Sequence, residues 1–313
     1  MINSNAVRTP AASALMPIDP HAPFDSTTFF KTFRHARAKV NGIRMHYVIG
    51  GQGEPVVLLN GYPQTWYAWR KIMPALATRH TVITVDVRGT GDSEKPPSGY
   101  DARNVAEDIY QLVRQLGFES INLVAYDITG RVGYAYAAAH SDEVQHLVLM
   151  ETLLPGFGLE EAMDVAKGGS YHFGFYANVD VAVSLVQGKE REHLKMMVQG
   201  SLYDKAAMTE ADINEYLQWY CSPGGLRGCF EHYRAFLGDS APNRESAKQK
   251  LKMPVLALYG AASGDTKVLP QTLLAVAENV WGEGVEDCGH YIAEERPDYL
   301  APRLLAFFKE NYV

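Results

Sequence analysis

Short runs of β-forming residues alternate with helical patterns over the first half of the 313-residue chain, and this alternation constrains the fold most strongly. The runs carry Val, Ile and Leu at consecutive positions, which is typical of strands that are covered on both faces. Strands that alternate with helices form βαβ units, so we expect a doubly wound, mostly parallel α/β sheet. The predicted strands of this half lie at 55–60, 80–86, 121–125 and 145–151.

The alternation stops between about Pro155 and Lys250, where aromatic-rich helical stretches follow one another, and it resumes with the strand-like run at 253–260. The simplest architecture is an α/β domain whose sheet is divided in the sequence by a helical insertion. We therefore expect an N-terminal arm at 1–35, a first part of the core at 36–154, a helical cap at 155–250 and a second part of the core at 251–313.

The composition excludes several classes of function. The formal net charge is −7 and Lys and Arg do not cluster, so we expect no nucleic-acid partner. No apolar stretch approaches the roughly 20 residues that span a bilayer, so we expect no membrane segment. Residues 1–23 make a poor signal peptide, which favours the cytoplasm but leaves an exported form open. The cysteine spacing fits no zinc site, and we expect neither a metal nor a cofactor.

In an open parallel sheet, ligands bind at the carboxyl ends of the strands, so the polar residues that follow the strands are candidate site residues. Asp127 follows the third predicted strand, Glu151 ends the fourth, and His290 lies near the end of the chain. The order nucleophile, acid, histidine is that of the α/β-hydrolase triad. Asp265, after the run at 253–260, is an alternative for the acid. We prefer Glu151, because a buried carboxylate has little structural role unless it is paired.

The stretch AYDITG at 125–130 has the small residues that a sharp strand–turn–helix bend requires around a nucleophile. Asp127 is also a suitable N-cap for the helix that begins near Thr129, and the stretch alone does not decide between the two roles. The accompanying Glu151 and His290 favour the nucleophile.

The identity of the nucleophile carries the chemistry. Aspartate is ionised at neutral pH and can displace a leaving group from sp³ carbon, which gives an ester of the enzyme. His290 would then activate the water that hydrolyses this ester, and the acid would balance the charge of its imidazole. The tetrahedral oxyanion needs donors, for which we predict the backbone N–H groups of Tyr62 and Ile128. Epoxide opening and carbon–halogen cleavage are reactions of this type.

From about residue 36 onward, the chain resembles the α/β-hydrolase epoxide hydrolases, and within them the Cif-like group. NGYPQTWYAW is similar to the family's H-G-x-P segment, DVRGTGDSEKP to its R-G-x-G-x-S loop, and CGHYIAEE to the segment of its histidine. The cap text SYHFGFYAN and FEHYRAFL implies that His172 and Tyr233 donate hydrogen bonds to the epoxide oxygen. The resemblance also implies a small-molecule epoxide as substrate and a homodimer. The predicted pocket residues are Pro63, Trp66, Phe173 and Phe175.

Two alternatives remain. Fluoroacetate-type dehalogenases share the aspartate and the histidine, but they carry an arginine and a tryptophan where this chain has Ile128 and Phe173. Arg131 is available one turn into the helix. A non-catalytic small-molecule receptor on the same scaffold is the second alternative, because a fold does not fix a function. The presence of Asp127, Glu151 and His290 together favours an enzyme. Ile128 and Phe173, which stand in place of the arginine and the tryptophan of the dehalogenases, favour epoxide opening.

Overall fold

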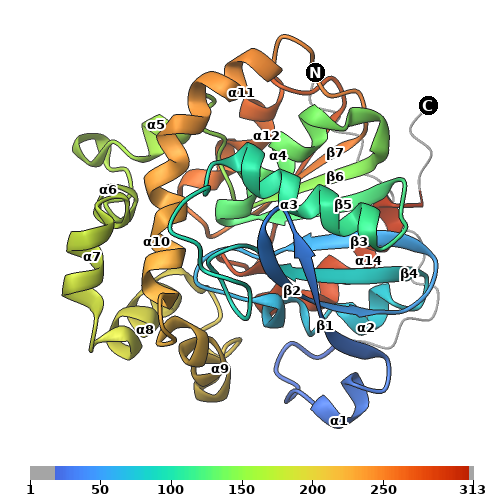
Figure 1. Cartoon of the computed structure of the whole chain (residues 1–313), viewed down its shortest axis with the longest axis horizontal. Helices are drawn as coiled ribbons and strands as arrows, with labels where there is room; N and C mark the ends of the chain where they lie inside the picture. Colours follow the sequence, from blue (N-terminus) through green and yellow to red (C-terminus); the bar gives the residue numbers. More distant parts are fainter. Residues whose placement is uncertain (1–17, 310–313) are drawn as a thin grey trace.

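The computed structural model describes residues 18–309, apart from the side chain of Asp265, and in this range it has an eight-stranded sheet with helices on both faces (Figure 1). The strand order is β1-β2-β4-β3-β5-β6-β7-β8; β1 pairs with β2 and β2 with β4 in antiparallel fashion, and all other pairs are parallel. The predicted class, a mostly parallel doubly wound sheet, is confirmed. The strands are β1 Phe33–Val40, β2 Ile43–Gly50, β3 Glu54–Leu59, β4 His80–Asp86, β5 Ile121–Tyr126, β6 Val144–Met150, β7 Val255–Gly260 and β8 Val280–Val285.

The central strands are buried on both faces, as their apolar runs predict. Along β5, Leu123 and Ala125 belong to one hydrophobic cluster and Val124 and Tyr126 to another, so successive side chains enter opposite layers. The first layer is covered by α3 Ala102–Gln115, α4 Gly130–Ala139 and α12 Leu269–Leu273. The second is covered by α2 Met73–Leu76, α13 Ile292–Glu295 and α14 Pro297–Phe307.

A layer of helices is inserted between β6 and β7, which are neighbours in the sheet although these helices separate them in the sequence. Figure 1 shows α5 to α10 gathered beside the sheet, with α10 packed against α6 and α7. The predicted insertion is thus confirmed, while the domain boundaries stay predictions. The helices of this insertion are α5 Leu159–Ala162, α6 His172–Ala177, α7 Val179–Val186, α8 Glu190–Ser201, α9 Glu210–Tyr220, α10 Gly225–Ala235 and α11 Ser240–Ser246.

The N-terminal region carries more structure than an arm. A short helix, α1 Ser26–Phe29, precedes β1, which begins at Phe33 within the segment expected to be an arm. The buried side chains of Phe29 and Phe33 stack on each other, with ring centroids 4.4 Å apart. Residues 1–17 of the predicted arm lie outside the described residues.

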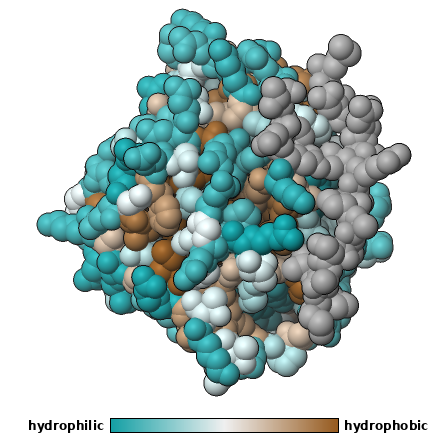
Figure 2. Space-filling view, turned by 90° about the vertical axis from the view of Figure 1, so that its right-hand side faces the viewer, coloured by the Kyte–Doolittle hydropathy of each residue, from teal (hydrophilic) through white to brown (hydrophobic). Residues whose placement is uncertain are grey.

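The molecular face away from the inserted helices is mixed in character. Figure 2 shows mainly hydrophilic residues there, with hydrophobic ones interspersed, where grey atoms do not cover the view. Within residues 18–309, no helix is both long enough and apolar enough to cross a membrane.

Candidate active site

The chain bends sharply at Asp127, between the end of β5 and the start of α4. Asp127 has φ 55°, in the left-handed region that non-glycine residues rarely adopt. Its carboxylate makes no cap to the following helix; Oδ1 instead accepts a hydrogen bond of 2.7 Å from the backbone N–H of Tyr62. The N-cap role that the sequence left open is therefore not the one observed. The backbone turns this carboxylate toward the loop that follows β3.

Small residues allow the bend to pack. A Cβ atom on Gly61 would lie 2.3 Å from the Cβ of Asp127, and one on Gly130 would lie 2.3 Å from Thr152 Oγ1. Thr129 is larger than Ala125 and Gly130, the other small residues around the bend, but its buried hydroxyl donates to the carbonyl oxygens of Leu59 and Tyr126 at 3.1 and 2.9 Å. Threonine thus fits because the bend satisfies its hydroxyl.

His290 joins the two carboxylates that follow β5 and β6. Its Nε2 lies 3.5 Å from Asp127 Oδ2, and its Nδ1 lies 2.7 Å from Glu151 Oε2. The side chains of His290 and Asp127 are 20% and 19% exposed, whereas that of Glu151 is fully buried. The structure therefore brings together the three residues predicted as nucleophile, acid and base.

Glu151 is held from several sides. Its carboxylate accepts hydrogen bonds from the backbone N–H of Gly260 at 2.6 Å, from Ser263 Oγ at 2.7 Å and from Thr266 Oγ1 at 3.0 Å. These donors and His290 compensate for its burial. Asp265 was the alternative acid, and its side chain lies outside the described part of the chain.

The two carboxylates set the protonation state of the histidine. Burial alone would lower the pKa of His290, but its contacts with Asp127 and Glu151 outweigh burial and raise the pKa to about 10. At neutral pH the imidazole of His290 is therefore protonated. A change in the charge of Asp127 would change the basicity of His290.

A cavity of about 640 Å³ opens above these residues, between the sheet and the helical insertion. Asp127, Glu151 and His290 contribute to its wall, together with residues of α6, α8 and α10. The other predicted site residues that line it are Tyr62, Ile128, His172, Phe173 and Tyr233.

Tyr233 and His172 approach the cavity from the insertion. Tyr233 lies on α10 and His172 is the first residue of α6; their rings meet edge to face with centroids 5.9 Å apart. Burial, followed by the nearby charge of Asp127, raises the pKa of Tyr233 well above its ordinary value. The phenol consequently keeps its proton at neutral pH and can act as a donor.

Three predicted pocket residues lie elsewhere. Trp66 is only 3% exposed and packs in the core, edge to face with His35 at 5.1 Å, while its backbone N–H donates to Asp86 Oδ1. Phe175 points toward Tyr176 and His193 within the insertion. Pro63 follows a cis peptide bond and is buried. None of the three is among the residues of the cavity wall.

Sequence reasoning missed several residues of the cavity wall. Tyr291 directly follows the histidine, is 3% exposed and lines the cavity. Ser263 and Thr266 hold Glu151, as described above. Both residues follow the predicted strand at 253–260, and this position could have identified them as candidates, although only Asp265 was selected there.

Arg131 does not enter the cavity. It is fully buried in α4, where its guanidinium pairs with Asp239 and donates to the carbonyl oxygen of Tyr100 at 2.9 Å. Among the described residues of the cavity wall there is no arginine. A substrate carboxylate would therefore lack a guanidinium partner there.

Comparisons with known proteins agree with this geometry. A family model described as alpha/beta hydrolase fold matches residues 54–297. The chain belongs to the α/β-hydrolase fold family, as the order and placement of its strands, bend and histidine indicate.

More specific relatives are found within that family. The chain is 37% identical over 280 residues to a soluble epoxide hydrolase of Corynebacterium sp. (strain C12), with 88% of this chain and 96% of that protein covered. It is similar to the crystal structure of wild-type Cfl2 from Burkholderia cenocepacia, with a TM-score of 0.83, 35% identity, and 89% of this chain and 96% of that one covered. A fluoroacetate dehalogenase of Burkholderia sp is 28% identical over 301 residues, covering 90% of this chain and 95% of that protein. The resemblance indicated by the motifs is confirmed.

Proposed function

We propose that this protein is an epoxide hydrolase that opens a small-molecule epoxide to a vicinal diol through an ester on Asp127. One observation carries the proposal, namely the arrangement of Asp127 in the wall of the cavity that Tyr233 and His172 also line. The Asp127 carboxylate, at a residue with left-handed backbone conformation, lies 3.5 Å from His290, and His290 is paired with the buried Glu151. The relationship to the soluble epoxide hydrolase of Corynebacterium supports this choice of substrate.

In the first step, an oxygen of the Asp127 carboxylate attacks a ring carbon and the carbon–oxygen bond of the epoxide breaks. The ring oxygen takes a proton from Tyr233, with His172 as the second donor, because a developing alkoxide requires hydrogen-bond donors opposite the attacking group. His290 then releases its proton, which replaces the one that Tyr233 gave up. This release is favoured because esterification removes the charge of Asp127 that held the pKa of His290 at about 10.

In the second step, neutral His290 takes a proton from a water molecule as its oxygen attacks the carbonyl carbon of the Asp127 ester. The backbone N–H groups of Tyr62 and Ile128 stabilise the oxyanion, and Glu151 balances the charge of the imidazolium. As the tetrahedral intermediate collapses, the carbon–oxygen bond of the ester breaks and the leaving oxygen takes the proton of the newly added hydroxyl group, which releases the diol and restores the carboxylate. The cycle ends with the imidazole protonated, as it began.

The test is to trap the ester. The variant His290→Gln, incubated with styrene oxide or an aliphatic epoxide, is expected to gain the mass of the substrate on the peptide that carries Asp127. The double variant Asp127→Asn, His290→Gln serves as control and should gain no mass. If the single variant gains no mass with any epoxide, the proposal fails.

Dehalogenation is the second candidate, favoured by the similarity to the fluoroacetate dehalogenase. Against it, Ile128 and Phe173 carry no side-chain donor, and Arg131 is paired with Asp239. Halide release from fluoroacetate or chloroacetate by the wild-type protein, together with no epoxide adduct, would decide for this candidate. A receptor without catalysis would bind epoxides but would neither form an adduct nor release halide.

A further inference from the structure

Glu295 is a buried carboxylate near the catalytic histidine that the mechanism above does not use. It is the last residue of α13 and only 1% exposed. Its Oε1 accepts hydrogen bonds of 3.1 Å from the backbone N–H groups of both Gly289 and Tyr291. The thiol of Cys288 also lies 4.0 Å from Oε1. These contacts enclose the backbone of His290 on both sides.

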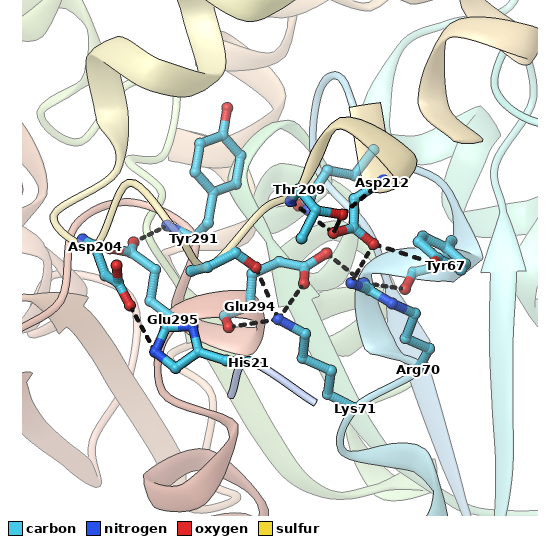
Figure 3. A network of polar contacts seen from close by, with 12 residues as sticks. His21, Tyr67, Arg70, Lys71, Asp204, Thr209, Asp212, Tyr291, Glu294 and Glu295 are labelled. Atoms are coloured by element: carbon cyan, nitrogen blue, oxygen red, sulfur yellow. Dashed lines mark hydrogen bonds and ion pairs between the residues drawn. The ribbon is translucent and has the colours of Figure 1, made fainter. Parts of the chain in front are cut away.

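The other oxygen of Glu295 contacts the helical insertion. Oε2 accepts hydrogen bonds from the backbone N–H groups of Tyr203 at 2.7 Å and Asp204 at 3.0 Å, in the segment that follows α8. Figure 3 shows Glu295 between Asp204 of the insertion and Tyr291 of the histidine loop. One carboxylate thus joins two segments that lie far apart in the sequence.

The same two segments also bond directly. The backbone N–H of His290 donates to the carbonyl oxygen of Ser201 at 2.9 Å. A Cβ atom on Gly289 would lie 2.3 Å from that oxygen, so the backbones pass in close contact. The position of His290 therefore depends on the segment at 201–204 as well as on the core.

We propose that Glu295 is a positioning residue for His290, which fixes the imidazole against Asp127 and Glu151 by joining the histidine loop to residues 201–204. A carboxylate suits this role because two acceptor oxygens receive four backbone N–H donors. The amide of a glutamine has one acceptor oxygen, and its NH₂ group would face two further donors. This inference rests on the proposed function, in which His290 acts on the ester.

The role predicts a step-specific defect. His290 activates water in the second step, and the first step depends on Asp127 and Tyr233. Glu295→Gln should therefore slow hydrolysis of the ester by about tenfold or more, since a small misplacement of a catalytic group is costly. Formation of the ester should change by less than about threefold, so the variant should accumulate the adduct during turnover.

The experiment is a rapid-quench time course with styrene oxide, in which intact mass gives the esterified fraction. Glu294→Gln is the matched control: Glu294 is the neighbouring glutamate of α13 and is fully buried, but it bonds Arg70 at 2.6 Å and Tyr216 at 2.8 Å rather than the histidine loop. It should lower the melting temperature without raising the esterified fraction. If Glu295→Gln does not fold, Glu295→Asp, which keeps both oxygens on a shorter side chain, receives the same measurement.

The outcomes separate the two proposals. If His290→Gln accumulates ester but the Glu295 variant slows both steps equally, or neither, the positioning role is wrong. If His290→Gln accumulates no ester, the proposed function itself fails. An esterified fraction that rises in Glu295→Gln and not in Glu294→Gln supports the positioning role.

Discussion

Asp127 and Glu151 share an unusual backbone conformation at the ends of neighbouring parallel strands. Their φ angles are 55° and 47°, and a left-handed non-glycine residue costs roughly 1 kcal/mol or more. Each is held there by its surroundings: Tyr62 donates to Asp127, and Gly260 donates to Glu151. This backbone conformation directs both carboxylates toward His290.

The charge of Asp127 should be measurable through His290. Asp127→Asn removes one of the two carboxylates that raise the pKa of His290, so the titration midpoint of the imidazole should fall below about 10. Glu151 remains and continues to raise it. NMR titration of histidine-labelled protein measures the midpoint, and Asp180→Asn, at an exposed pair with Arg227, is the control. An unchanged midpoint in Asp127→Asn would contradict the coupling.

Tyr233 should matter for the first step only. Tyr233→Phe removes the phenolic donor, and we expect formation of the ester to slow by about a hundredfold while its hydrolysis changes little. Tyr176→Phe is the control, because that hydroxyl bonds His193 at 2.7 Å instead of lining the cavity. Single-turnover kinetics with an epoxide separate the two steps. Equal effects of the two variants would remove Tyr233 from the mechanism.

The acid can be assigned by a pair of substitutions. Glu151→Gln should abolish hydrolysis of the ester, because the carboxylate that pairs with His290 is lost. Asp265→Asn should leave turnover nearly unchanged. Steady-state diol formation measures both, and the reverse result would transfer the role to Asp265.

Part of this site can be predicted from the sequence for a physical reason. Asp127 and Glu151 follow apolar runs directly, and parallel strands end at one edge of a sheet, so their convergence with His290 follows from topology. Trp66 and Phe175 could not be assigned in this way. An aromatic residue of a loop or cap suits a pocket and a core equally, and only the direction of its side chain decides.

At the scale of elements, the strands from β3 to β7 lie where the apolar runs predict them, because burial on both faces leaves a continuous signal. The hairpin of β1 and β2 was not predicted. Its first strand, FRHARAKV, mixes charged and apolar residues at the edge of the sheet. The signal was present at Asn41–Gly42, where both residues have positive φ, since Asn-Gly is a preferred hairpin turn.

A buried ionic network joins the core to α9. The guanidinium of Arg70 bonds Asp212 at 2.7 Å and Glu294 at 2.6 Å, with Lys71 3.0 Å from Glu294 (Figure 3). Removing one partner of a buried ion pair leaves an uncompensated charge, so Arg70→Ala should reduce the free energy of unfolding by about 3–5 kcal/mol.

Urea denaturation measures this loss. The control is Arg37→Ala, because Arg37 pairs with Asp92 on the surface and its side chain is 49% exposed. Such a pair is worth at most about 1 kcal/mol. Similar losses in the two variants would mean that the buried network does not stabilise the contact between core and insertion.

At the scale of the whole molecule, oligomeric state and location stay predictions. We propose a homodimer from the resemblance to the family. The insertion exposes Val181 and Leu185, four residues apart on one face of α7, with exposed fractions of 45% and 58%. Light scattering should give about twice 34.7 kDa, and Leu185→Asp should return the mass of one chain if this face mediates the contact. A wild-type mass of one chain would end the proposal.

The bond between His290 N–H and the carbonyl oxygen of Ser201 has a consequence for protein engineering. Exchanging the helical insertion between relatives is an obvious way to change which epoxides are accepted. In this chain, however, the exchanged insertion would include Ser201, whose carbonyl oxygen helps to hold His290 in place. Because residues 201–204 contribute backbone groups to these bonds, we expect chimeras that preserve the backbone path of this segment to turn over the new substrate, and chimeras that displace it to stall as the ester.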